Sequence, residues 1–124
     1  MIRIILAAML MSSSVAAHEL TPTYFYFKPS YIEGVSITTV ELWNRRDDAE
    51  YYEIYVADKD WGRIPFATRD RIIRLPHLSR EKINIYVKQE DKARVEFICS
   101  SSKQLKSDVK STGIKSTICS RIER

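Results

Sequence analysis

The chain has 124 residues, which is enough for one compact domain but too few for two. Its formal net charge is +4, and from Ser100 onward six basic residues stand against two acidic ones, so the positive excess lies in the C-terminal segment. The remainder is close to neutral, which argues against the dense basic face of a nucleic-acid-binding protein.

The first 17 residues have the pattern of a secretory signal peptide. Arg3 supplies the positive charge, residues 4–11 form an apolar core, and residues 15–17 are the small residues that precede cleavage. Cleavage after Ala16 fits almost as well as cleavage after Ala17. No apolar run approaches the roughly 20 residues of a membrane-spanning helix. We therefore expect a signal peptide at 1–17 and one mature domain at 18–124, exported to the periplasm or beyond the cell and without a membrane span after processing.

The sequence of the mature chain predicts short strands, because apolar residues alternate with polar ones in segments that polar turns separate. A proline at position 65 restricts residues 63–68 to an edge or an irregular position. No segment has a helical apolar stripe, and at most one helical turn is expected at 104–109. The expected strands, in chain order, are residues 21–28, 35–44, 51–57, 63–68, 72–75, 82–87, 94–99 and 114–122.

The apolar patterns of four of these strands predict which residues share a face. In residues 35–44, Val35 and Ile37 share one parity whereas Val40 and Leu42 have the other, which indicates a bulge or a strand that switches faces. Residues 51–57 alternate without interruption. The positions expected to face inward are Tyr52, Ile54, Val56, Ile83, Ile85, Val87, Val95, Phe97 and Cys99.

About seven short strands in about 100 residues are typical of an all-β fold, a single immunoglobulin-like β-sandwich. A small barrel is the alternative. The sandwich would bury Trp43 in its core together with Tyr52 and Phe97.

Two cysteines, Cys99 and Cys119, lie in the last third of the chain. Export to an oxidising compartment favours one disulfide between them. Closing a loop of about 20 residues would stabilise the fold by roughly 3 kcal/mol. Free thiols or a metal pair are the alternatives, but only two histidines are present to complete a metal site, and no closely spaced cysteine pair suggests redox catalysis.

Several segments together carry a family resemblance. Thr21-Pro22-Thr23 opens the first strand, residues 40–44 end in an asparagine, and residues 52–56, 64–67 and 73–87 follow in the expected order. This arrangement resembles the immunoglobulin-like N-terminal domain of periplasmic pilus-assembly chaperones, the PapD-like superfamily. The resemblance implies a non-enzymatic protein that binds a partner by strand addition. In the family, basic cleft residues hold the partner's C-terminal carboxylate. The matching position of the cleft arginine is Tyr24, and Lys28 is the nearest cation.

An aromatic run at residues 24–27 is the candidate contact surface. Its exposed parity predicts that Tyr24, Tyr26 and Lys28 contact a partner protein at a strand edge. A stacking platform for glycans that includes Tyr31 is the alternative. The same edges would make permanent contacts if the protein were a structural component of a surface assembly or virus particle.

A third hypothesis concerns copper. Cleavage after Ala17 would make His18 the first mature residue, whose amino group and imidazole could chelate copper, with His77 as the other imidazole. Otherwise no cofactor is expected. Neither histidine lies in a motif that activates a serine, and three glycines form no phosphate-binding loop, so we expect no enzymatic activity.

Overall fold

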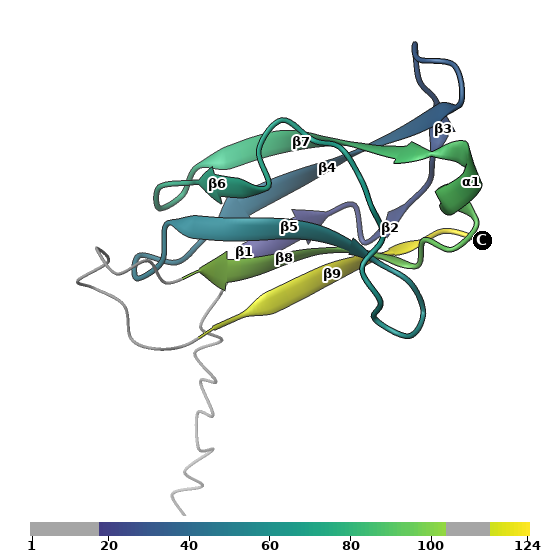
Figure 1. Cartoon of the computed structure of the whole chain (residues 1–124). Coiled ribbons are helices and arrows are strands. Elements are labelled where there is room, and N and C mark those ends of the chain that lie inside the picture. Colours follow the sequence, from purple (N-terminus) through teal and green to yellow (C-terminus); the bar gives the residue numbers. More distant parts are fainter. Residues whose placement is uncertain (1–17, 104–114) are drawn as a thin grey trace, which may run out of the picture.

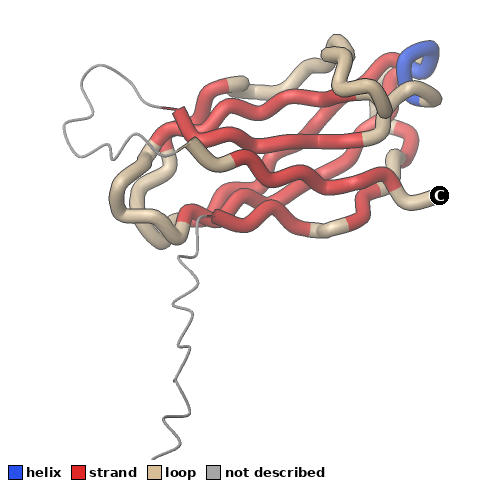
Figure 2. The backbone as a smooth tube through the Cα atoms, turned by 90° about the horizontal axis from the view of Figure 1, so that it is seen from below, coloured by secondary structure: helices blue, strands red, loops and turns tan. Residues whose placement is uncertain are grey.

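The computed structural model describes residues 18–103 and 115–124. In it, two β-sheets pack face to face (Figure 1). One helical turn, α1 (Gln89–Lys92), lies at one end of the sandwich (Figure 2). Within the described ranges, no helix has the length and apolar content needed to cross a membrane. The predicted signal peptide and the predicted helical turn at 104–109 lie outside the described residues.

The first sheet, sheet A, is built around one long strand. This central strand, β4, pairs over residues 35–43 with β7 on one side, and with β1 and β3 in succession on the other. All these pairs are antiparallel. The strands of sheet A are β1 (His18–Thr21), β3 (Lys28–Pro29), β4 (Val35–Asn44) and β7 (Arg80–Lys88).

The second sheet, sheet B, has the strand order β2-β9-β8-β5-β6. Its first pair, β2 with β9, is parallel, and the others are antiparallel. The chain between β1 and β3 therefore leaves sheet A, contributes one short strand to sheet B and returns. The strands of sheet B are β2 (Tyr24–Phe25), β5 (Tyr51–Ala57), β6 (Ile72–Arg74), β8 (Phe97–Lys103) and β9 (Thr117–Ile122).

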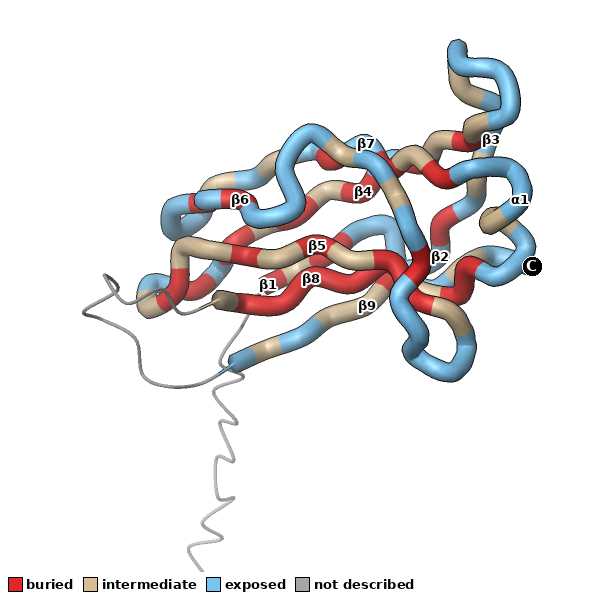
Figure 3. Tube along the Cα trace, in the orientation of Figure 1, coloured by how far each residue is buried: buried red, intermediate tan, exposed pale blue. Residues whose placement is uncertain are grey.

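The core lies between the sheets, where the inner faces of the long strands are buried (Figure 3). Alternation predicted these faces correctly for β5 and β7, whose outer positions are more exposed. The all-β fold, an immunoglobulin-like sandwich with one disulfide, is confirmed. The largest fully buried apolar side chains are Tyr52, Phe25, Leu42, Ile54, Ile85 and Ile98.

The predicted bulge in residues 35–44 is wrong. Strand β4 pairs with β7 in one continuous register and alternates without a change of face. Ser36 and Thr38 point into the sandwich, and the Ser36 hydroxyl donates a hydrogen bond to Gln89 Oε1 (2.8 Å). The apolar residues Val35 and Ile37 consequently lie on the outer face of sheet A.

The expected faces of β8 also need correction. The register pairs Ile98 with the core residue Val56, so Ile98 faces inward, and Phe97 and Cys99 belong to the outer face. The ring of Phe97 stacks there on Trp61, with centroids 4.3 Å apart.

Trp43, also expected in the core, instead lies on the outer face of sheet A. Two guanidinium groups cover its ring, that of Arg80 at 4.1 Å and that of Arg45 at 4.8 Å from the ring centroid. Such cation–π contacts suit a partly exposed tryptophan.

The predicted disulfide joins Cys99 of β8 to Cys119 of β9, which are direct neighbours in the register. It links the last two described strands at the point where their Cα atoms are 4.0 Å apart. β9 is thereby fixed covalently to the centre of sheet B.

Candidate functional site

The predicted contact residues lie where the chain passes from sheet B to sheet A. Tyr24 belongs to β2, Lys28 to β3, and Tyr26 to the link between them. The two tyrosines are 59% and 60% exposed, whereas Phe25 between them is buried in the core. The alternation therefore leaves Tyr24, Tyr26 and Lys28 on the surface; their contact with a partner stays a prediction.

The outer edge of β9 is only partly covered. Strand β2 pairs with Arg121 and Ile122, and the N–H of Arg121 donates to the Thr23 carbonyl (2.9 Å). Backbone groups alternate sides along a strand, so those of Thr117 and Cys119 point the same way as those of Arg121. Within the described part of the chain, no strand pairs with this side of residues 117–120.

Two arginines that the sequence analysis did not identify lie next to Tyr24. Arg121 pairs with Tyr24 in the register, and its Nε donates to Glu96 Oε1 (3.0 Å). Arg124 donates to Glu96 Oε2 (2.7 Å). Glu96 is largely buried and ion-paired with both, so its single negative charge offsets one of the two positive charges.

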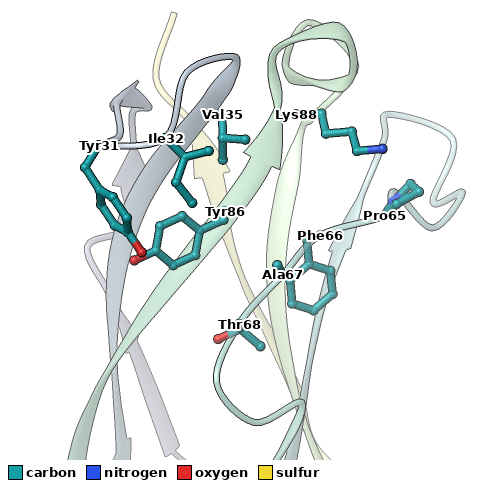
Figure 4. A pocket seen from close by; sticks show the side chains of 9 residues that line it. All are labelled: Tyr31, Ile32, Val35, Pro65, Phe66, Ala67, Thr68, Tyr86 and Lys88. Atoms are coloured by element: carbon teal, nitrogen blue, oxygen red, sulfur yellow. The ribbon is translucent and has the colours of Figure 1, made fainter.

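An apolar groove of about 470 Å³ opens on the outer face of sheet A (Figure 4). Tyr31 and Tyr86 form one wall, with their rings edge to face at 6.4 Å, and Phe66 lies opposite. Tyr31 is 86% exposed. The groove is defined by the side chains of Tyr31, Ile32, Val35, Phe66, Tyr86 and Lys88.

Local hydrogen bonds position both walls of the groove. Ala67 and Tyr86 exchange two backbone hydrogen bonds of 2.9 Å, which fix residues 65–68 along β7. On the other side, the Ser30 hydroxyl donates to the Val35 carbonyl (2.6 Å), and Gly34 has a φ of +77°, which glycine adopts readily. The groove thus forms from this chain alone.

Sequence reasoning did not find this groove. Its residues come from three segments, 31–35, 65–68 and 86–88, that only the fold brings together. The available signal was the parity of Val35 and Ile37, which marks apolar residues on the solvent side of β4 rather than a bulge.

A buried polar cluster lies at the opposite end of β4 from the groove. His18 of β1 is 3% exposed, and its Nε2 lies 2.9 Å from Ser100 Oγ while its Nδ1 lies 3.1 Å from Ser116 Oγ. Arg46 donates to Ser116 Oγ (3.2 Å) and forms an ion pair with Asp48. Both imidazole nitrogens of His18 are therefore engaged.

Burial controls the titration of this cluster. It lowers the pKa of His18 below 6.5; the hydrogen bond to the Ser100 carbonyl opposes that shift, and the charge of Arg46 adds to it. Burial raises the pKa of Tyr52 to about 12. The His18 and Tyr52 rings lie 4.7 Å apart, so the cluster favours a neutral imidazole beside a neutral phenol.

The second copper candidate, His77, is exposed in the turn after Pro76. Within residues 18–103 and 115–124, no group of three or more histidine, cysteine or acidic side chains is placed to hold a metal ion. Copper binding through His18 and His77 stays a prediction, and at His18 it would require the imidazole to exchange a serine contact for the metal.

Comparisons with known proteins give no family assignment from sequence, because no family profile and no curated protein matches the chain. Solved structures do match. The E. coli chaperone DraB superposes with a TM-score of 0.62 at 17% identity, over 86% of this chain and 53% of DraB, so the chain spans about half of that chaperone.

Two other matches agree. PapD-like domain 7 of human CEP192 gives a TM-score of 0.52 at 15% identity, over 86% of this chain and 82% of the domain. A Porphyromonas gingivalis protein of unknown function gives 0.53 at 12% identity, over 85% of this chain and 45% of that protein. At these identities the likeness establishes the fold alone. The chain has a fold that resembles the PapD-like immunoglobulin sandwich.

Proposed function

We propose that this protein is an exported, non-enzymatic binding module that pairs with an extended segment of another protein by strand addition. The observation that carries the proposal is the uncovered edge of β9 at residues 117–120. In strand addition, main-chain hydrogen bonds provide affinity and side-chain contacts provide specificity. The exposed Tyr24, which pairs with Arg121 at the end of this edge, would supply such a contact.

The fold supports the same proposal. DraB, which shares it, is a chaperone. The disulfide supports a stable edge, because it ties β9 to β8 directly at Cys119, within the uncovered stretch. A strand fixed in this way can present its outward backbone groups without leaving its own sheet.

One substitution tests the edge. In Thr117→Pro the ring removes the outward N–H, whereas the inward pairing with β8 does not use that group. Thr117→Ala is the matched control, because both variants lose the Thr117 hydroxyl contact with Ser101 (2.7 Å). We expect tagged wild-type protein and Thr117→Ala to capture the same protein from a periplasmic extract, identified by mass spectrometry, and Thr117→Pro to lose it. Equal capture by all three proteins would refute strand addition at β9.

A structural component of a surface or virus assembly would use the same edge permanently. Size-exclusion chromatography separates the two proposals: a chaperone-like module should release its client and elute as a small protein, whereas an assembly component should stay in a large particle.

A further inference from the structure

We propose that the groove lined by Tyr31, Phe66, Tyr86 and Lys88 is a second docking surface, which accepts an acidic segment of a partner protein through one apolar side chain. The proposal goes beyond strand addition at β9, because the groove lies on the outer face of the other sheet.

The lining of the groove favours an apolar anchor. Aromatic rings form both walls, and Ile32 and Val35 add aliphatic surface next to Tyr31 (Figure 4). Tyr31 and Ile32 are 86% and 45% exposed, so large apolar side chains that would normally be covered meet the solvent here. A groove of about 470 Å³ has room for one large side chain and its neighbours.

The charge around the groove favours an acidic partner. No carboxylate lines it, and the Lys88 side chain extends across its mouth toward Pro65 (Figure 4). Lys28 adds a second cation, because it lies opposite Ile37, and Ile37 lies opposite Tyr86. Among the described residues, neither lysine forms an ion pair. Glu33, in the turn next to Ile32, lies outside the lining as Lys28 does, so the lining itself carries one charge, that of Lys88.

A third cation, the guanidinium group of Arg71, holds the Phe66 wall of the groove in place. The Arg71 guanidinium lies 4.9 Å over the Phe66 ring, and its Nη2 donates to the Phe66 carbonyl (3.0 Å). With the two backbone hydrogen bonds between Ala67 and Tyr86, this contact pre-organises the groove before any partner arrives. Pre-organisation lowers the entropic cost of binding, so a short segment can bind with useful affinity.

The test selects peptides with the whole chain. A phage-displayed library of random nine-residue peptides is panned on the disulfide-bonded protein, and the enriched peptides are measured by fluorescence anisotropy. We expect them to carry an aliphatic or aromatic residue flanked by aspartate or glutamate. Their affinity should fall at high salt, because the lysines are exposed to solvent.

Variants locate the binding. Tyr31→Ser and Lys88→Glu should each weaken peptide binding by about tenfold or more, since the first removes an apolar contact and the second reverses the charge that attracts an acidic peptide. Ile72→Ser and Lys59→Glu, exposed residues outside the groove, are the matched controls and should leave affinity unchanged. Tyr31 and Lys88 are both exposed, so these substitutions should preserve the fold, which circular dichroism verifies.

Thr117→Pro separates this proposal from strand addition, because it alters the β9 edge and leaves the groove intact. Retained peptide binding by Thr117→Pro supports a distinct surface. Loss in Thr117→Pro, full binding by Tyr31→Ser and Lys88→Glu, enrichment of neutral or basic peptides, or no enrichment at all would each overturn the proposal.

Discussion

Asn44 ends β4 fully buried, and its side chain satisfies four polar groups from three parts of the chain. Its Nδ2 donates to the carbonyls of Ala49 (2.7 Å) and Leu75 (2.8 Å), while Oδ1 accepts from the Arg46 N–H (2.9 Å) and the Tyr52 hydroxyl. One amide therefore ties the turn after β4 to β5 and to the segment after β6. This geometry gives Asn44 a structural role within the chain, independent of any partner protein.

Asn44→Ala should destabilise the protein by about 3 kcal/mol, because it leaves several buried polar groups without partners. Urea denaturation followed by fluorescence measures the loss. Asn84→Ala is the control: its side chain is exposed and accepts one hydrogen bond from Thr39, so it should cost about 0.5 kcal/mol or less. Similar stabilities for the two variants would contradict this account of Asn44.

His18 predicts a dependence of stability on pH. Because burial lowers its folded-state pKa below the unfolded value of 6.5, the unfolded chain binds the proton more readily. The stability contributed by neutral His18 is therefore fully present above pH 6.5 and is lost as the pH falls from 6.5 toward the folded pKa. Urea midpoints between pH 8 and pH 5 should fall for the wild type. His18→Gln should flatten the slope relative to His77→Gln; identical slopes would exclude His18 as the cause.

At the scale of the element, alternation predicts a strand well when its inward residues are apolar. β5 and β7 meet this condition, and their faces were predicted correctly. β4 and β8 do not, since Ser36 and Thr38 of β4 and Ser100 of β8 point inward. Ser100 can do so because His18 supplies a hydrogen-bonding partner across the sandwich, a contact that no local pattern encodes.

The candidate surfaces divide in the same way. Exposure of Tyr24 and Tyr26 followed from the parity of a local run, with Phe25 as the buried residue between them. The apolar groove could not be predicted from a local run, because Phe66 and Tyr86 come close together only through the pairing of Ala67 with β7. Local sequence thus indicated that Tyr24 and Tyr26 lie on the surface, but tertiary pairing decided which residues share the groove.

The contribution of the disulfide between β8 and β9 to the free energy of unfolding can be measured directly. Cys99 and Cys119 are 20 residues apart, and a loop of this length should stabilise the protein by roughly 3 kcal/mol in the chain-entropy account. The double variant Cys99→Ser, Cys119→Ser should lose this amount in urea denaturation. Reduced wild-type protein serves as the control and should match it. A double variant as stable as the oxidised wild type would show that the crosslink does not stabilise the fold.

At the scale of the whole molecule, the two proposed surfaces belong to different sheets. The β9 edge is part of sheet B, whereas the groove lies over β4 and β7 of sheet A. A partner bound at one surface therefore leaves the other accessible, unless the partner is large enough to wrap around the sandwich.

The disulfide links the fold to the compartment, since such bonds form and persist outside the cytoplasm. We expect the full chain, expressed in bacteria, to reach the periplasm oxidised and with an intact mass that begins at His18; a mass beginning at Ala17 would place cleavage after Ala16. Leu6→Asp, which puts a charge into the predicted apolar core of the leader, should keep the protein in the cytoplasm with both thiols reduced. If the Leu6→Asp protein is exported and oxidised but still begins at Met1, the prediction of a cleaved signal peptide is wrong. The copper hypothesis depends on the α-amino group of His18, which exists only if His18 is the mature N-terminus. The same mass spectrum therefore tests both the cleavage site and the copper hypothesis.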